Sequence, residues 1–242
     1  MSGHSKWATT HRQKEAKDAK RGAIFTKLAA QIAVAVREGG GVGDPDKNFR
    51  LRLVMDKARE FNMPKDNISR AIEKGMGTAG GEALVNVTYE GFVPGGAAVM
   101  IETVTDNKAR TVQLVRNVME NGGGTLGGSG AVSYLFIPLG ELVMDTEGKN
   151  AEQAELDAID AGVNDFEADG LKLILYCDRD KIFLLKEAME KKGYRVESAE
   201  LVMKPEVLVE VTDPDVRGKV ENLLEKIEEL DDVSKVWTNY AG

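Results

Sequence analysis

The stretch LVNVTYEGFVPGGAAVMIETVT, residues 84–105, decides the fold, because the hydrophobic period of the chain changes there. Apolar and polar residues alternate along 84–93 and again along 97–105, which predicts two strands. The Pro-Gly-Gly sequence at 94–96 predicts a β-hairpin turn between them. The chain before this hairpin has a helical period, and the chain after it combines strands with helices.

Three helices are predicted before the hairpin. Apolar residues recur at helical spacing along 24–38 and along 47–61, and a third helix begins near Pro64. Pro64 suits the first position of that helix, and Gly75 is expected just beyond its last residue. The glycine-rich residues 76–83 predict a linker and the first domain boundary.

The chain after the hairpin alternates short strands and helices. Strands are expected at 131–137, 140–146, 165–169, 171–178, 194–204, 207–211 and 232–239, and helices at 109–123, 150–162, 180–193 and 213–230. Units with two strands per helix favour ferredoxin-like sandwiches, and the middle block alone supplies a complete set. We therefore predict an α+β fold in which an N-terminal three-helix domain precedes two ferredoxin-like α/β sandwich domains, one inserted in the other. The predicted domains are 1–80, 81–130 plus 205–242, and the insertion 131–204.

Charge is divided unevenly along the chain. The whole protein carries a formal net charge of −8, but residues 1–80 hold 16 basic and 9 acidic residues, a net of +7. The remainder, residues 81–242, therefore carries a net of −15. A basic module on an acidic body predicts a polyanionic partner that residues 1–80 contact. Trp7, His4 and His11 lie among the first cations, and aromatic rings beside cations favour nucleic acid.

Composition excludes several other classes of protein. A single cysteine excludes a disulfide framework, and with only two histidines it makes a zinc site improbable. Cys177 lies in an apolar run and is expected to be a buried thiol. No apolar run approaches the length of a membrane span, and no secretory signal is recognisable, so a cytoplasmic protein is expected. No Ser/His/Asp, Cys/His or metal–carboxylate arrangement emerges, so we expect neither enzymatic activity nor a cofactor nor a small-molecule substrate.

The glycine cluster at 122–130 contains a GxGxxG spacing. A dinucleotide-binding fingerprint needs a strand before the loop and a helix after it, and here the order is reversed. The cluster is interpreted as a helix end leading into an interdomain crossing. The alternative is a backbone nest that approaches phosphate or RNA.

The sequence Thr105–Thr111, TDNKART, joins a strand to a helix. Either Asp106 or Asn107 can cap that helix. The alternative is a contact surface formed by Asn107, Lys108 and Arg110. His4 and His11 lack partners for a metal site and suit contacts to phosphate or base.

Several segments together resemble one known family. They are GHSKWATTHRQKEAKDAKRGAIFTKL (3–28), REGGG (37–41), LRLVMDKAREFNMPKDNISRAIEKG (51–75), YEGFVPGGAAV (89–99), TDNKART (105–111) and GGSGAVSYLF (127–136). These segments are similar to those of the YebC/PmpR family of bacterial probable transcriptional regulatory proteins, related to the mitochondrial translational activator of cytochrome oxidase. Thr9-Thr10 and Ala131 depart from the usual pattern.

The resemblance implies the three-domain fold, nucleic-acid binding and no catalytic residues. Our first hypothesis is a DNA-binding transcriptional regulator that makes mostly phosphate contacts. The alternative is a translation factor that binds the ribosome or ribosomal RNA and relieves stalling on proline-rich stretches. An enzyme that uses the glycine loop is a third class. The oligomeric state is open, and a monomer is compatible with the sequence. The candidate nucleic-acid-binding residues are His4, Lys6, Trp7, His11, Arg12, Lys14, Lys17, Lys20, Arg21, Lys27, Arg70, Lys74, Asn107, Lys108 and Arg110.

Overall fold

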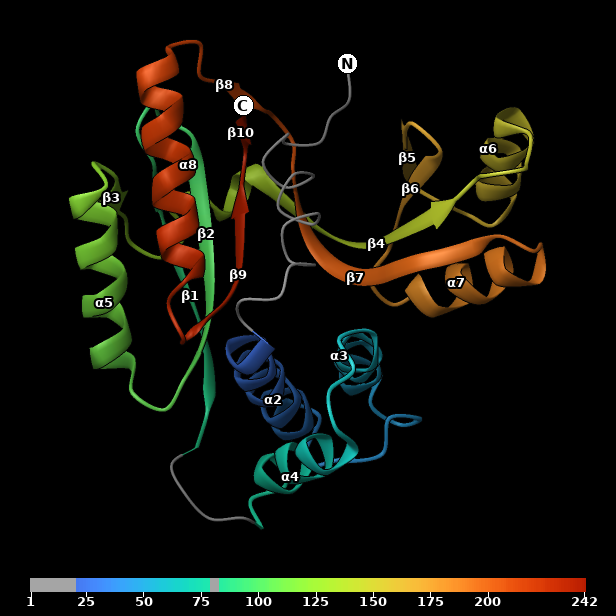
Figure 1. The fold of residues 1–242 in the computed structure, drawn as a ribbon, viewed down its shortest axis with the longest axis horizontal. Coiled ribbons are helices and arrows are strands. Elements are labelled where there is room, and N and C mark those ends of the chain that lie inside the picture. The colour runs from blue at the N-terminus through green and yellow to red at the C-terminus, as the bar shows by residue number, and fades with distance from the viewer. Residues whose placement is uncertain (1–20, 79–82) are drawn as a thin grey trace. The chain divides into compact units, whose positions relative to one another are not determined.

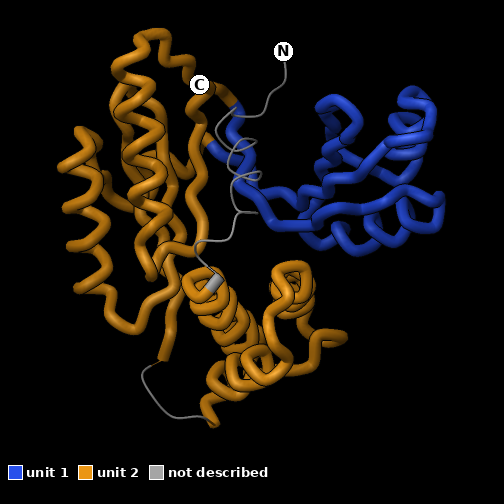
Figure 2. The backbone as a smooth tube through the Cα atoms, viewed as in Figure 1, with its two compact units in different colours: residues 1–4, 136–206 blue, residues 5–135, 207–242 orange. Residues whose placement is uncertain are grey.

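The computed structural model describes residues 21–78 and 83–242. These residues form two compact units (Figure 2). One unit, here called the inserted unit, is Phe136–Glu206. The other, the main unit, contains the described residues before Phe136 and those from Val207 to Gly242. The predicted α+β class is confirmed, since helices come first and two antiparallel sheets with helices follow (Figure 1).

Three helices begin the main unit: α2 (Arg21–Glu38), α3 (Phe49–Glu60) and α4 (Lys65–Gly75). Both α3 and α4 pack on α2, around a core that includes Ile32 and Leu51, each 0% exposed. Asn48 caps α3 by accepting a hydrogen bond from the Leu51 backbone N–H. The same side chain donates to the carbonyl oxygens of Ala35 and Val42. One buried amide therefore fixes both the start of α3 and the loop that leads to it.

The end of α4 differs from the prediction by two residues. Gly75 was expected just beyond the helix but is its last residue, and the left-handed residue is Gly77, with φ +79°. The backbone N–H of Gly77 bonds to Lys74 and that of Thr78 to Glu73, which is a Schellman motif. Gly75 serves packing, since a Cβ there would lie 2.5 Å from the Ala33 carbonyl oxygen of α2.

The main sheet has the strand order β3-β1-β2-β9. Its strands are β1 (Val85–Phe92), β2 (Ala98–Thr105), β3 (Thr125–Leu126) and β9 (Val233–Thr238). The predicted hairpin is β1–β2, paired antiparallel from Val85–Thr105 to Phe92–Ala98. Helices α5 (Lys108–Asn121) and α8 (Pro214–Glu228) pack on one face, over Val99 and Ile101. A short parallel pair, β8 (Val209–Glu210) with β10 (Tyr240–Ala241), completes the unit.

The inserted unit follows the order β-α-β-β-α-β. It comprises β4 (Phe136–Asp145), α6 (Ala151–Asp160), β5 (Asp165–Asp169), β6 (Lys172–Cys177), α7 (Ile182–Lys191) and β7 (Arg195–Pro205). Its antiparallel sheet has the order β5-β6-β4-β7, which is the ferredoxin-like arrangement. Cys177 is buried as expected, and burial raises the pKa of its thiol to about 11.

Two strand predictions were wrong. Residues 131–137 and 140–146 were expected to be separate strands, but the structure has a 3₁₀ turn, η1 (Ser133–Leu135), and then the single strand β4. Pro138 does not interrupt β4, because it lies before Gly140, where the pairing with β6 begins, and so has one neighbouring strand. The strand expected at 207–211 is reduced to the two residues of β8.

Candidate nucleic-acid interface

Most of the predicted basic segment lies outside the described residues. The candidates concerned are His4, Lys6, Trp7, His11, Arg12, Lys14, Lys17 and Lys20. Arg21 is the first residue of α2, and its side chain is likewise not described. These positions remain predictions from the sequence.

Lys27 lies on α2 and is partly buried. Its Nζ donates a hydrogen bond to the carbonyl oxygen of Glu228, the last residue of α8. Nearby on α2, Gln31 donates to the Ser234 carbonyl oxygen at 3.4 Å. An ammonium group that interacts with the C-terminal carbonyls of a helix is favourably placed there. Lys27 therefore has a structural partner inside the main unit.

The exposed face of α4 holds two predicted cations that have no acidic partner among the described residues. Arg70 and Lys74 are one helical turn apart, and both side chains are exposed, while Ile68 and Ala71 bury the other side. In residues 21–78 and 83–242 no ion pair or hydrogen bond is made by the Arg70 or Lys74 side chain. Within these ranges, both charges are open to an anionic partner.

The three arginines of α3 are paired with carboxylates. The pairs are Arg50 with Glu38, Arg52 with Asp46 at 2.9 Å and Arg59 with Asp56 at 2.9 Å. An acidic neighbour lowers the attraction of a cation for phosphate. The three arginines of α3 are therefore less available to phosphate than Arg70 and Lys74 of α4.

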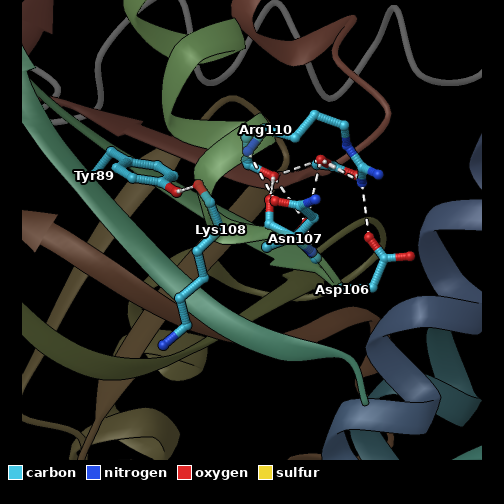
Figure 3. Close-up of polar contacts among 8 residues, drawn as sticks. Tyr89, Asp106, Asn107, Lys108 and Arg110 are labelled. Atoms are coloured by element: carbon cyan, nitrogen blue, oxygen red, sulfur yellow. Dashed lines mark hydrogen bonds and ion pairs between the residues drawn. The ribbon is translucent and has the colours of Figure 1, made fainter. Parts of the chain in front are cut away.

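Residues 105–111 form a hydrogen-bonded cluster at the start of α5 (Figure 3). The Asn107 side chain caps the helix by accepting from the Arg110 N–H at 3.0 Å. The Asn107 N–H in turn donates to the Thr105 hydroxyl at 2.9 Å. The capping interpretation therefore accounts for Asn107.

Asp232, which the sequence analysis did not single out, completes this cluster. Its carboxylate accepts from the Thr111 hydroxyl at 2.6 Å and pairs with Arg110 at 3.2 Å. Asp106 holds the same guanidinium at 2.9 Å (Figure 3). The hydrogen bond and charge of Asp232 raise the pKa of Arg110, and Asp106 adds to this shift. Arg110 is thus neutralised by two carboxylates, and no local pattern around Asp232 indicates this.

Lys108 is the remaining candidate on α5. Its side chain is exposed and points away from the contacts between Asp106 and Arg110 (Figure 3). The Tyr89 hydroxyl donates to the Lys108 carbonyl oxygen at 3.4 Å. Burial, followed by the charge of Asp232, raises the pKa of Tyr89. Of the three cluster candidates, Lys108 is the one whose charged group is directed outward.

Residues 130–133, at and just after the end of the glycine cluster, bind a carboxylate of the protein itself. Glu90 on β1 is 6% exposed, and its carboxylate accepts from the N–H groups of Gly130, Val132 and Ser133 at 2.8–2.9 Å. Gly130 has φ +84°, a conformation that suits glycine. Burial alone raises the pKa of Glu90, but the three backbone hydrogen bonds outweigh it and hold the pKa below its ordinary value. The N–H groups of residues 130–133 therefore hold a carboxylate of the protein itself, and a nest for phosphate or RNA within residues 122–130 stays a prediction.

Among the residues that the structure describes, no group of three potential ligands is placed to hold a metal ion. In the same part of the chain, every helix is too short or too polar to cross a membrane.

Comparison with known proteins identifies relatives along nearly the whole chain. The model of the TACO1/YebC protein N-terminal domain matches residues 5–78, and that of the TACO1/YebC second and third domain matches residues 84–240. A probable transcriptional regulatory protein of Caldanaerobacter subterraneus subsp. tengcongensis is 42% identical over 240 residues, which is 99% of this chain and 98% of the relative. One from Chloroflexus aurantiacus is 44% identical over 241 residues, covering 99% and 95%.

A solved structure is also similar. The crystal structure of the conserved hypothetical protein Aq1575 from Aquifex aeolicus matches with a TM-score of 0.83 and 41% identity, covering 92% of this chain and 91% of that one. The family suggested by the sequence segments is therefore confirmed. The chain belongs to the TACO1/YebC family, whose curated relatives are named probable transcriptional regulatory proteins.

Proposed function

We propose that this protein is a non-enzymatic, cytoplasmic regulator that binds DNA through residues 1–80 and thereby controls transcription. The observation that carries the proposal is the division of charge, +7 on residues 1–80 against −15 on the remainder. Arg70 and Lys74 support it, because they extend a positive surface onto α4. The names of the relatives, probable transcriptional regulatory proteins, agree with it.

Phosphate contacts supply most of the affinity in this proposal. Lysine and arginine side chains that replace condensed counterions give binding that falls steeply with salt, by about 0.9 logarithmic units per contact per tenfold salt. Arg110 and Lys27 contribute little, since each has a partner in the protein. The acidic body is repelled by phosphate, so the duplex contacts one side of the molecule.

The test in solution uses a fluorescent duplex and two pairs of charge reversals. In the double variant Lys17→Glu, Arg21→Glu, affinity falls at least about tenfold at 0.1 M salt, because two phosphate contacts become repulsive. Arg70→Glu with Lys74→Glu lowers affinity in the same direction. The control, Lys191→Glu with Lys219→Glu, makes the same charge change at exposed positions of α7 and α8 and leaves binding within about twofold. Equal losses in all three variants would show that net charge, not this surface, governs binding.

A second candidate function is regulation of translation on the ribosome. The observation in its favour is Trp7 among the cations of the first segment, because unstacked RNA bases pack on aromatic rings. Crosslinking in cells followed by sequencing of the attached nucleic acid separates the two candidates. Discrete promoter peaks support transcriptional control, whereas recovery of ribosomal RNA with promoters at background refutes it and supports the ribosome.

A further inference from the structure

The outward face of α6, in the inserted unit, has two apolar side chains that the protein leaves exposed. Leu156 and Ile159 are 56% and 55% exposed, whereas Ala154 and Ala158 are 0% exposed on the opposite side of the helix. Residues three apart are neighbours on a helix, so Leu156 and Ile159 form one apolar pair. A scattered exposed leucine needs no explanation, so the surroundings of this pair decide what it means.

Carboxylates surround the apolar pair. Helix α6 contains Glu152, Glu155, Asp157 and Asp160, and it contains no lysine or arginine. Asp157 pairs with Lys192 at 2.6 Å. The side chains of the other three make no ion pair or hydrogen bond with any residue of the ranges 21–78 and 83–242. Each of these three carboxylates lies one helical turn from a member of the apolar pair.

This arrangement of charges is unfavourable for the protein alone. Like charges three residues apart on a helix repel each other, as Glu152 and Glu155 do here. The last turn of α6 has Asp160 and no basic residue, and a carboxylate at that end opposes the helix dipole. A cation bound at this face would relieve both kinds of repulsion.

Helix α7 of the same unit provides a comparison. Its Leu184 is 68% exposed. The charged residues of α7 are balanced, however, with Lys186 and Lys191 against Glu187 and Glu190, and Lys191 lies 3.6 Å from Glu187. The exposed leucine of α7 therefore has neighbours of both signs, whereas the apolar pair of α6 has neighbours of one sign.

The sign of the charge limits what can cover the α6 face. Nucleic acid and anionic lipid surfaces are repelled by unpaired carboxylates. A purely apolar partner would bury these carboxylates without a counter-charge, which is costly. A protein segment with both basic and apolar side chains avoids both penalties.

We propose that the outward face of α6 binds a basic segment of another protein, one that carries apolar side chains at helical spacing between lysines or arginines. Its apolar side chains cover Leu156 and Ile159, and its cations pair with Glu152, Glu155 and Asp160. The ten residues of α6 extend over only about 15 Å, so the contact is small and of the transient class. This contact does not depend on nucleic-acid binding.

The first test uses a synthetic helical peptide with leucines on one face and lysines beside them. It is added to ¹⁵N-labelled full-length protein, and amide shifts are followed by NMR. The largest shifts are expected within residues 151–160. A peptide of the same composition with its leucines spread around the helix, and one with glutamate in place of lysine, bind at least about tenfold more weakly. Equal binding of either control peptide would overturn the proposal.

The apolar contribution is measured with Leu156→Ser combined with Ile159→Ser. Affinity for the first peptide falls at least about tenfold, because two apolar side chains no longer become buried. The control Leu184→Ser removes an equally exposed leucine from α7 and leaves affinity unchanged. Equal losses in the two variants would show that the peptide binds exposed apolar residues anywhere on the protein, against the proposal.

The charge contribution is measured with Glu152→Gln combined with Glu155→Gln. Affinity falls about twofold to tenfold at low salt and by less at high salt, since exposed ion pairs are weak and screened. The control, Glu187→Gln with Glu190→Gln, makes the same charge change on α7 and leaves affinity unchanged. These side chains are on the surface, so thermal unfolding is expected to show that each variant remains folded. Equal losses in both charge variants would reduce the effect to net charge and overturn the proposal.

The partner in cells is tested by photo-crosslinking. The amino acid benzoylphenylalanine replaces Leu156, or Leu184 as the control, and the linked peptides are identified by mass spectrometry. A basic segment with apolar residues at helical spacing, linked only from position 156 and lost when Glu152→Gln and Glu155→Gln are added, supports the proposal. Links to an acidic segment, links to a second copy of this chain, or no links from position 156 would each overturn it.

Discussion

Two regions of the main unit differ in whether their charged side chains have partners in the protein. Around the main sheet, Glu90, Arg110 and Asp232 are each matched by groups of the protein, through backbone N–H donors or ion pairs. On α4, Arg70 and Lys74 are exposed and make no ion pair or hydrogen bond with any residue of the described ranges. Sequence alone gave Arg110 and Arg70 the same rank as candidates.

The difference teaches that a count of cations does not measure the charge available to a ligand. A guanidinium held by two carboxylates has little net attraction for phosphate, whereas an isolated one keeps all of it. Matched charges contribute to the stability of the protein, and unmatched ones contribute to binding. Substitutions in the two regions should therefore separate stability from affinity.

The largest expected effect on stability is that of Glu90→Ala. The substitution leaves three backbone N–H groups without their acceptor, so the free energy of unfolding falls by about 2–5 kcal/mol. Chemical denaturation with circular dichroism measures it. Glu120→Ala on the exposed side of α5 is the matched control and changes stability by less than about 0.5 kcal/mol. An equal change in both variants would contradict a structural role for the Glu90 carboxylate.

The stability of the protein at acid pH should also depend on the Glu90 carboxylate. The folded-state pKa of Glu90 lies below its ordinary value of 4.5, so the ionised group stabilises the folded protein above that pH. This contribution is lost as the pH falls from 4.5 through the folded-state pKa. Denaturation curves measured between pH 7 and pH 3 should show a smaller decline for Glu90→Gln than for the unchanged protein. Parallel declines would exclude a depressed pKa.

Asp232→Ala is expected to lower the free energy of unfolding by less than Glu90→Ala does. The Thr111 hydroxyl and Arg110 lose a shared acceptor that is largely buried, which costs about 1–3 kcal/mol of stability. Asp106→Ala removes the exposed partner of the same guanidinium and costs at most about 1 kcal/mol. Thermal unfolding of both variants measures the difference. The reverse order of stabilities would show that Asp106, not Asp232, holds the cluster.

The smallest stability effect is expected on α4. Arg70→Gln with Lys74→Gln changes the free energy of unfolding by less than about 0.5 kcal/mol, since neither side chain has a partner to lose within residues 21–78 and 83–242. The same variant lowers the slope of logarithmic affinity against logarithmic salt concentration by up to about 2. Fluorescence anisotropy over a salt series measures the slope. A large loss of stability with an unchanged slope would show that these two cations stabilise the folded protein and do not contact nucleic acid.

Local patterns predicted much of the fold. The hairpin at 84–105 appears as β1–β2, and the helices appear within a few residues of the expected positions, because apolar period and capping residues act over one or two turns. The error at Pro138 arose because the effect of a proline depends on how many neighbouring strands are present. The end of α4 was misplaced because Gly75 is required by α2, a distant neighbour.

Local sequence patterns predicted fewer of the contacts in the candidate site. Asn107 could be recognised as a cap from its own position in the chain. Asp232 lies more than a hundred residues from Arg110, and Glu90 occupies an ordinary polar position of an alternating strand. The glycine cluster at 122–130 gave little signal for Glu90, because two of the three N–H donors, Val132 and Ser133, lie beyond it.

By itself the sequence determined the class of the fold, the family and the uneven division of charge, since these depend on period, motif and composition. Only the tertiary structure decided which charges are matched. It brings Asp232 to Arg110 and closes the loop at 130–133 over Glu90. Both follow from packing between distant segments, where a partner's position in space, and not its position in the chain, sets the electrostatic energy.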